Sequence, residues 1–405
     1  MSGGSADGVI ERSALEPTAL RAALAAREPT AAAEGEIRVV RAPGRVNLIG
    51  EHTDYNLGLV LPAAIDLEVR MAIVPTGGDR RVKIELLDSG ERDGFDLDAI
   101  PAAADRWIDY PAGVAWSMSE AGLAVRGFRA VLGSTLPMAS GLSSSAAMEL
   151  ASAWALLDPP ELEAHGIDAM GLAQLCQRAE NVHVGVNSGL MDQFASSLGR
   201  AGSAMLLDCR SLASREVRLP LDDHALVVCD SGSPRRLGSS EYNARRAQCE
   251  RAVAVIARED PRVRSLRDVD LATLEGFADR LDAETRRRCE HVIRENDRVL
   301  AAVDHLEVGD VEAVAQLFAE SHASLRDLYE VSSDELDALV EIATSIPGTA
   351  ARMTGAGFGG CTVNLVPRAE LDRFADAIVR EYRARTGLEA RVLVVAAADG
   401  AGLMG

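Results

Sequence analysis

One short stretch, residues 44–58, constrains this chain more than any other. An apolar core of Val46, Leu48 and Ile49 continues from a strand expected at residues 37–40. Polar and charged side chains crowd around that core: Arg45, Asn47, Glu51, His52, Asp54, Tyr55 and Asn56. Because a surface loop would rarely hold an apolar strand among so many polar residues, the stretch predicts a preformed polar pocket. Its carboxylates would accept paired hydrogen bonds from the hydroxyls of a sugar or polyol.

A second stretch predicts a phosphate-binding loop. After a strand expected at residues 129–132, a run of small residues at 139–147 leads into a helix expected over 146–157. At such a junction, free backbone N–H groups and the positive end of the helix dipole converge on one point. A helix cap needs one serine, whereas this run has three consecutive serines at 143–145. The residues expected at the nucleotide are Gly141, Ser143, Ser144, Ser145 and Ala146.

A third stretch, residues 352–365, is rich in glycine. Gly355, Gly357 and Gly360 fit the G-x-G-x-x-G spacing of dinucleotide sites. In such sites a strand precedes the glycines and a helix follows, whereas here a strand is expected after them, at residues 361–366. The glycines therefore predict a turn that lets backbone approach the active site without side-chain bulk.

These stretches resemble, in type and order, the three signatures of the GHMP small-molecule kinases, and residues 45–55 resemble the first signature of the galactokinases. The resemblance runs from about residue 37 to the C-terminus. It implies an α+β fold with two lobes and the active site in the cleft between them. Residues 1–200 would form the N-terminal lobe and residues 201–405 the C-terminal lobe. The implied reaction transfers the γ-phosphoryl group of ATP to the anomeric hydroxyl of galactose, giving galactose 1-phosphate and ADP.

The resemblance also implies roles for single residues. Asp192 would be a base or would orient the hydroxyl, and Arg45 would keep Asp192 ionised and stabilise charge on the transferred group. The cofactor would be Mg²⁺, held by Glu180 and by Ser145 or, second, Ser144. The sugar would be bound by Glu51, His52, Asp54, Gly189 and Tyr242.

Simpler interpretations of the same residues remain open. Glu180 alone would be a solvated acid on a helix expected over 173–184, and Asp192 alone would be a first-turn acid favoured by the helix dipole. Trp107 and Tyr110 lie on a helix expected over 105–121, and they are either core aromatics or the adenine contacts that the resemblance implies. The later histidines show no metal-ligand spacing and are expected to be structural: His291, His305 and His322.

Composition excludes several classes of partner. A net charge of −20 would repel nucleic acid and anionic membranes. The sequence has no run of about 18 apolar residues, so no membrane span is expected. Residues 1–8 lack the apolar core of a signal peptide. The 6 cysteines are scattered without a C-x-x-C pair, which argues against a disulfide framework or a zinc site. A cytoplasmic monomer is expected, with galactose and ATP as its small-molecule partners.

Three other functions are weighed against this one. The first is a kinase for a related acceptor, such as N-acetylgalactosamine or arabinose. The second is a galactose-sensing regulatory protein that binds sugar and ATP without turnover, although such relatives lose small residues from the serine loop, which is intact here at residues 143–147. The third is a nicotinamide oxidoreductase, which the order of the motifs disfavours.

Overall fold

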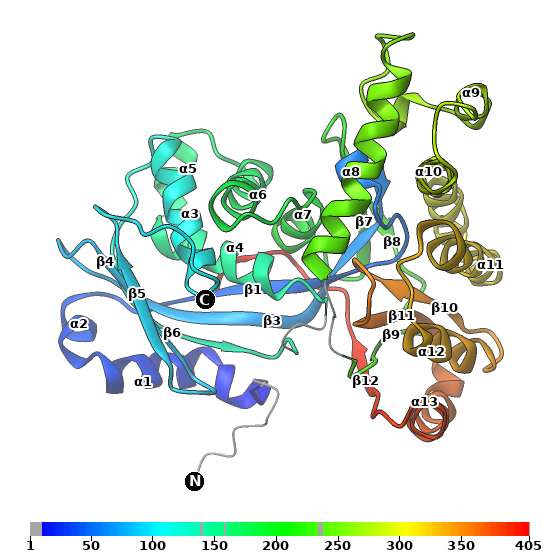
Figure 1. The fold of residues 1–405 in the computed structure, drawn as a ribbon. Coiled ribbons are helices and arrows are strands. Elements are labelled where there is room, and N and C mark those ends of the chain that lie inside the picture. Colours follow the sequence, from blue (N-terminus) through cyan, green and yellow to red (C-terminus); the bar gives the residue numbers. More distant parts are fainter. Residues whose placement is uncertain (1–9, 138–140, 158, 234–237, 405) are drawn as a thin grey trace.

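The computed structural model describes residues 10–137, 141–157, 159–233 and 238–404, and it has two halves side by side (Figure 1). Residues 138–140, at the start of the predicted phosphate loop, lie outside the described residues. Within the described ranges, no helix is long and apolar enough to cross a membrane.

The first half is built on a 6-stranded sheet. Its strands, in spatial order, are β13 (Gly402–Met404), β1 (Arg38–Asn47), β3 (Pro62–Pro75), β6 (Phe128–Ser134), β4 (Arg81–Leu86) and β5 (Arg92–Asp96). One face is covered by α3 (Asp109–Glu120), α4 (Ser144–Leu156), α6 (Ala169–Arg178) and α7 (Met191–Leu198), with α5 (Pro159–Ala164) linking α4 to α6. The other face is covered by α1 (Pro17–Arg27) and α2 (Pro29–Glu34). Apolar residues on both faces of the central strands explain this sandwich, since each face must be buried.

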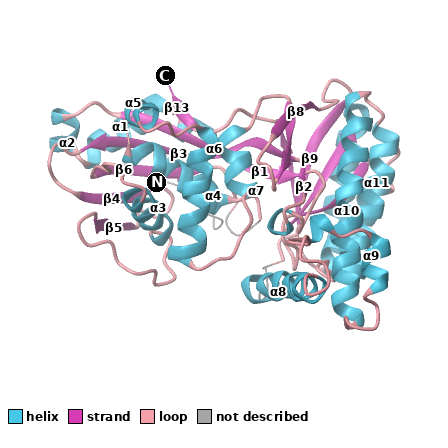
Figure 2. Cartoon of the chain, turned by 90° about the horizontal axis from the view of Figure 1, so that it is seen from above, coloured by secondary structure: helices cyan, strands magenta, loops and turns pink. Residues whose placement is uncertain are grey.

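The second half contains a 4-stranded sheet and most of the later helices. The strands, in spatial order, are β10 (Ala350–Thr354), β11 (Cys361–Pro367), β9 (His224–Asp230) and β12 (Arg391–Val395). The helices are α8 (Gly238–Ile256), α9 (Leu271–Gly276), α10 (Ala283–Glu307), α11 (Val311–Ser324), α12 (Asp334–Thr344) and α13 (Leu371–Thr386). Alternate β9 residues face α12 and α13 on one side and α10 and α11 on the other. Figure 2 shows α8 to α11 gathered at the end of the molecule away from the first sheet.

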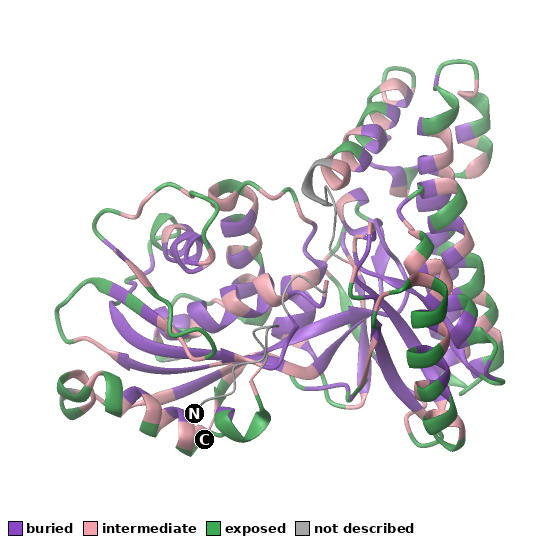
Figure 3. Ribbon diagram, turned by 60° about the horizontal axis from the view of Figure 1, so that its bottom comes forward, coloured by how far each residue is buried: buried purple, intermediate pink, exposed green. Residues whose placement is uncertain are grey.

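Strand pairings cross the predicted boundary at residue 200 in both directions. β2 (Leu59–Val60) pairs with β7 (Ser203–Asp208), which pairs with β8 (Ser214–Arg218). In return, β13 pairs with β1. The central strands of both sheets are buried (Figure 3), and one apolar cluster extends from Val40 in β1 to Val363 in β11. The two halves therefore share a core and hold the cleft between them in a fixed geometry.

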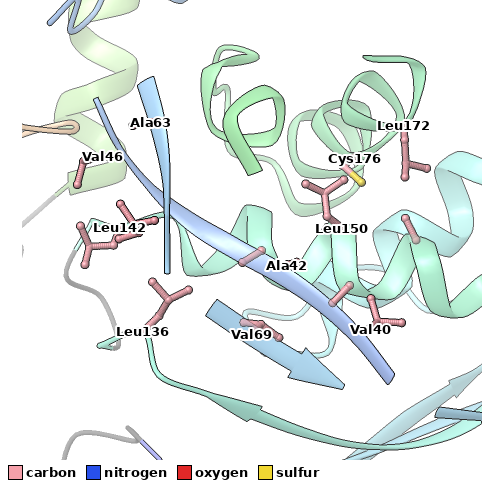
Figure 4. Packing of buried hydrophobic residues seen from close by; sticks show 14 of the residues in the cluster. Val40, Ala42, Val46, Ala63, Val69, Leu136, Leu142, Leu150, Leu172 and Cys176 are labelled. Carbon is pink, nitrogen blue, oxygen red and sulfur yellow. The ribbon is translucent and has the colours of Figure 1, made fainter. Parts of the chain in front are cut away.

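The core around β1 anchors the strand that leads to the site. Ala42 of β1 belongs to the same cluster as Leu150 of α4 and Leu172 and Cys176 of α6, while Val46 lies further along the strand, near Leu142 (Figure 4). All of these side chains are buried. Large-to-small changes in such a core lower the free energy of unfolding by about 2–5 kcal/mol. This close packing holds β1 and α4 in place relative to each other.

Two predicted helices differ from the structure. The helix expected over 105–121 begins only at Asp109, so Trp107 precedes it. The helix expected over 173–184 ends at Arg178 and continues as a π-helix, Ala179–Val184.

Candidate active site

A pocket of about 440 Å³ lies where the two halves meet. That volume is in the range of small-molecule sites. From the first half it is lined by Arg45, Glu51, His52, Asp54, Tyr110, Gly141, Ser143, Ser144, Ser145, Glu180, Val186, Ser188, Gly189, Met191 and Asp192. From the second half it is lined by Tyr242, Gly355, Ala356 and Gly357. Residues from all three sequence motifs thus meet in one place.

An arginine–aspartate pair lies at the centre of the pocket. The Arg45 guanidinium donates from Nε to Asp192 Oδ1 at 2.8 Å and from Nη2 to Asp192 Oδ2 at 2.7 Å. Its Nη1 donates to the Gly141 carbonyl at 2.6 Å, and the Ser143 hydroxyl also donates to Asp192. Such a two-pronged contact fixes both orientation and charge. The carboxylate is thereby held beside the phosphate loop.

Local backbone features aim these side chains. β1 has an irregularity in its pairing between Pro43 and Arg45, and a bulge of this kind redirects the following side chain. Gly44 allows it, because a Cβ there would lie 2.4 Å from the side chain of Leu136 and 2.6 Å from the Leu142 carbonyl. Asp192 follows Met191 in the first turn of α7, where the helix dipole favours a negative charge.

Asp54, predicted to bind the sugar, lines the pocket. It is buried, and burial, followed by the nearby charge of Asp192, raises its pKa to about 6. Gly189 lies against it, since a Cβ on Gly189 would lie 1.9 Å from Asp54 Oδ2. The backbone of Gly189 also hydrogen-bonds the Tyr242 hydroxyl. Three of the predicted sugar residues are thus in mutual contact.

His52 already has a partner at each ring nitrogen. Burial, followed by the charge of His291, lowers its pKa to about 3, so the ring is neutral. Ala356 O can only accept, so Nε2–H donates to it at 3.2 Å and Nδ1 accepts from the Tyr55 hydroxyl at 2.8 Å. The Tyr55 oxygen lies 2.8 Å from the Tyr329 hydroxyl. Both ring nitrogens of His52 therefore already have protein partners.

Glu51 is held from the second half of the chain. Its Oε1 accepts from the Gly355 amide at 3.1 Å, and its Oε2 lies 2.5 Å from Arg352 Nη1. Burial, partly opposed by Arg352, raises the pKa of Glu51. The carboxylate lines the pocket while joining the first motif to the third.

The phosphate loop leads directly into α4. That helix begins at Ser144, and Ser143 before it has φ +61°, a left-handed conformation. The backbone N–H groups of the first helical turn have no partners within the helix, and Ser143, Ser144 and Ser145 line the pocket at this point. Ala146 is fully buried behind the loop and does not line the pocket. Its small side chain lets the helix start pack closely.

A π-turn presents Glu180 to the same pocket. The residue lies in the segment Ala179–Val184, a local form often found at functional sites. Glu180 Oε2 accepts from the Ser188 hydroxyl and from Gln193 Nε2 at 2.9 Å, and Ser145 also hydrogen-bonds this carboxylate. Burial, reinforced by the Asp192 charge, raises the pKa of Glu180. A second buried acid, Glu149, lies close by and shares Gln193 Nε2 at 2.9 Å.

The two predicted adenine contacts separate in the structure. Tyr110, in the first turn of α3, lines the pocket. Trp107 does not line it, because it precedes the helix and its indole Nε1 donates to Glu91 Oε1 at 2.9 Å. An adenine contact for Trp107 stays a prediction.

Several residues around the pocket were not predicted individually. Glu149 lies inside the second motif, and Gln193 follows Asp192. Only the fold shows that Gln193 Nε2 donates to both Glu149 and Glu180. Val186 and Ser188 line the pocket just before Gly189. Their closeness to Gly189 and Asp192 in the sequence is the only signal that could have identified them.

Comparisons with known proteins agree with this geometry. The galactokinase galactose-binding signature matches residues 30–75, the GHMP kinase N-terminal domain residues 109–200, and the GHMP kinase C-terminal domain residues 300–384. Galactokinases of Chloroflexus aggregans and of a Roseiflexus species are each 44% identical over 365 residues, covering 90% of this chain and 92% of the relative.

Comparison with solved structures agrees with these sequence matches. Lactococcus lactis galactokinase complexed with galactose superimposes with a TM-score of 0.85 at 35% identity, over 91% of this chain and 95% of that one. Methanococcus jannaschii mevalonate kinase superimposes with a TM-score of 0.64 at 16% identity, over 90% and 99% of the two chains. The second likeness concerns the fold alone.

The fold and the phosphate loop together define a GHMP kinase with its active site between two halves, as the sequence predicted. The galactose-binding signature and the identity along most of the chain narrow this further. The chain belongs to the galactokinase family.

Proposed function

We propose that the protein transfers the γ-phosphoryl group of ATP to the anomeric hydroxyl of galactose, giving galactose 1-phosphate and ADP. The observation that carries this proposal is the Arg45–Asp192 pair, which lies between the sugar side and the phosphate side of one pocket. Phosphoryl transfer depends on alignment and charge stabilisation, and both sides of the pocket converge on this pair. The proposed setting is a cytoplasmic monomer.

The residues would divide the work as follows. Asp54, Gly189 and Tyr242 would hold the sugar so that its anomeric hydroxyl faces Asp192. Asp192 would orient that hydroxyl or take its proton as the bond to phosphorus forms. Arg45, freed in part from Asp192 by the incoming group, would stabilise negative charge on the transferred phosphoryl.

The phosphates of ATP would bind at the start of α4. Gly141 and the serines at 143–145 line that end of the pocket, and their backbone N–H groups would bind the phosphates. The helix dipole adds to this attraction. Tyr110 marks the direction in which the base would extend.

The donor set around Glu180 fits Mg²⁺. No group of three His, Cys, Asp or Glu side chains forms a metal site within the residues that the structure describes. Mg²⁺, however, is commonly held by one or two carboxylates together with substrate phosphates. Glu180 and the Ser145 hydroxyl touch each other beside Asp192, and the buried Glu149 Oε1 has no hydrogen-bond partner. When bound, Mg²⁺ would neutralise charge on the phosphates.

The metal assignment can be tested without turnover. ATP with Mg²⁺ should raise the melting temperature of the wild-type protein more than ATP alone, because a ligand that binds only the folded state stabilises it. Glu180→Ala should remove most of that extra shift. If the metal-dependent shift persists in Glu180→Ala, Glu180 is not a ligand.

A coupled ADP-release assay with a panel of sugars tests the function itself. Galactose should give the highest kcat/KM in a panel with glucose, N-acetylgalactosamine and arabinose. A higher value for N-acetylgalactosamine or arabinose would make the protein a kinase for that sugar. Sugar binding without any ADP release would make it a sensor.

A further inference from the structure

The sugar-side turn rests on one helix of the second half. Gly50 N–H donates to Glu295 Oε1 at 3.1 Å, and His291 Nε2 lies 3.2 Å from the Glu51 carbonyl, which can only accept. At the far end of the turn, Leu59 N–H donates to Asn296 Oδ1 at 2.8 Å. All of these α10 side chains are buried. Side chains of one helix, α10, thus hydrogen-bond the segment 50–59 at both ends.

Glu295 is the centre of this contact. It is fully buried, and besides Gly50 its Oε1 accepts from the Ser321 hydroxyl at 2.6 Å, while its Oε2 accepts from Arg298 Nε at 2.7 Å. Despite burial, Arg298 and other nearby cations lower its pKa to about 2, so it is ionised. A buried charge of this kind is costly unless it is paired and hydrogen-bonded.

Arg352 links this cluster to the pocket. It is fully buried, with Nη1 2.5 Å from Glu51 Oε2 and Nη2 3.8 Å from Glu295 Oε1. Nη1 also donates to the Leu48 carbonyl at 2.8 Å. A movement of Glu295 would therefore pass to both the backbone and the side chain of the sugar-side turn.

We infer that Glu295 is a positioning residue for the sugar: it fixes the turn that carries Asp54 and so sets sugar affinity without touching the sugar. This inference rests on the proposed function, because the turn is the one proposed to bind galactose. Gly50 has φ +102° and a Cβ there would lie 2.6 Å from the Leu59 carbonyl. A turn this tight transmits a small displacement at Gly50 to Asp54, and small misplacements cost binding and rate steeply.

Kinetics of two variants separate positioning from simple stability. Glu295→Gln should raise the KM for galactose about tenfold, and Ser321→Ala, which keeps every charge, should raise it about two- to threefold. The KM for ATP should stay at the wild-type value in both. Glu290→Gln is the matched control on α10, since Glu290 is partly exposed and pairs with Arg294. If Glu295→Gln does not fold, Ser321→Ala decides.

A wild-type KM for galactose in the folded variants, with only the melting temperature lowered, would overturn the inference. Hydrogen exchange without substrate gives an independent reading: amides 50–59 should exchange faster in Ser321→Ala and Glu295→Gln than in the wild type, while strand β9 should not change. Absence of galactose-dependent ADP release in the wild type would defeat the proposed function alone. Unchanged exchange at 50–59 would defeat the positioning inference alone.

Discussion

The sugar side of the pocket is closed by side chains that already hold one another, whereas the phosphate side is lined by a helix start and small residues. Around the sugar turn, His52 and Glu51 each have protein partners from the second half of the chain. At the predicted phosphate loop, the pocket is lined by Gly141 and by the serines at 143–145. The first side is preorganised by tertiary contacts and the second by local structure.

This difference teaches how each ligand would be selected. A buried acceptor such as Asp54 would discriminate among hydroxyl arrangements, because a mismatched sugar would leave a buried carboxylate unpaired, at a cost of about 1–3 kcal/mol. Backbone N–H groups at a helix start attract any phosphate. Changes on the sugar side should therefore alter acceptor binding, and changes at the centre should alter turnover.

The largest effect is expected at the junction of the two sides. Asp192→Asn keeps the shape but removes the charge that Arg45 binds, and if Asp192 is a general base, kcat should fall about 10²- to 10⁴-fold with little change in either KM. Steady-state kinetics with both substrates varied gives the values. Asp168→Asn, at the cap of α6, is the control outside the pocket. More than about half of the wild-type kcat in Asp192→Asn would exclude both proposed roles.

Gly189→Ala should damage the sugar side alone. The added Cβ would lie 1.9 Å from Asp54 Oδ2, so the carboxylate must move. The KM for galactose should rise about 10- to 100-fold, whereas the ATP-induced rise in melting temperature should persist. Gly276→Ala, where a Cβ meets nothing within 4 Å, is the control. An unchanged KM for galactose would mean that Asp54 does not bind the sugar.

The two sides of the pocket also differ in how much of their structure could be predicted from the sequence. The phosphate loop is contiguous, so strand, serines and helix start were all predictable from residues 129–157. The sugar turn was recognisable from Glu51 to Asn56, but its supports were not. Glu295 and His291 lie in a helix whose alternating charges indicate a solvated face, and only tertiary packing shows that both are buried.

Local sequence also failed where the backbone departs from a regular form. Glu180 lies in a π-turn, Ala179–Val184, and helical periodicity contains no sign of that turn. Trp107 falls just before α3, where a late helix start turns it toward Glu91. For Trp107, a shift of a few residues in the helix boundary leaves the side chain outside the pocket lining, whereas Glu180 lines the pocket despite the change of helix type.

Lowering the pH should weaken the sugar side before the phosphate side. The raised pKa of Asp54, about 6, means that its carboxylate binds a proton as the pH falls through 6 and loses an acceptor. If only the ionised form binds the sugar, the KM for galactose should rise about tenfold between pH 7 and pH 5, with a smaller change in the KM for ATP. The steep part of the galactose profile should be lost in Asp54→Asn. Equal galactose KM values at pH 5 and pH 7 in the wild type would contradict this.

The smallest effect decides to which side Ser143 belongs. The sequence predicts a nucleotide contact, but in the structure its hydroxyl donates to Asp192, together with two donors from Arg45. Because Arg45 remains, Ser143→Ala should lower kcat only about three- to tenfold, about the value of one ordinary hydrogen bond, and leave the KM for ATP unchanged. Ser152→Ala, on the same helix but bonded to the Met148 carbonyl, is the control. A raised KM for ATP with an unchanged kcat would instead assign Ser143 to the phosphates, and Asp192 would then be held by Arg45 alone.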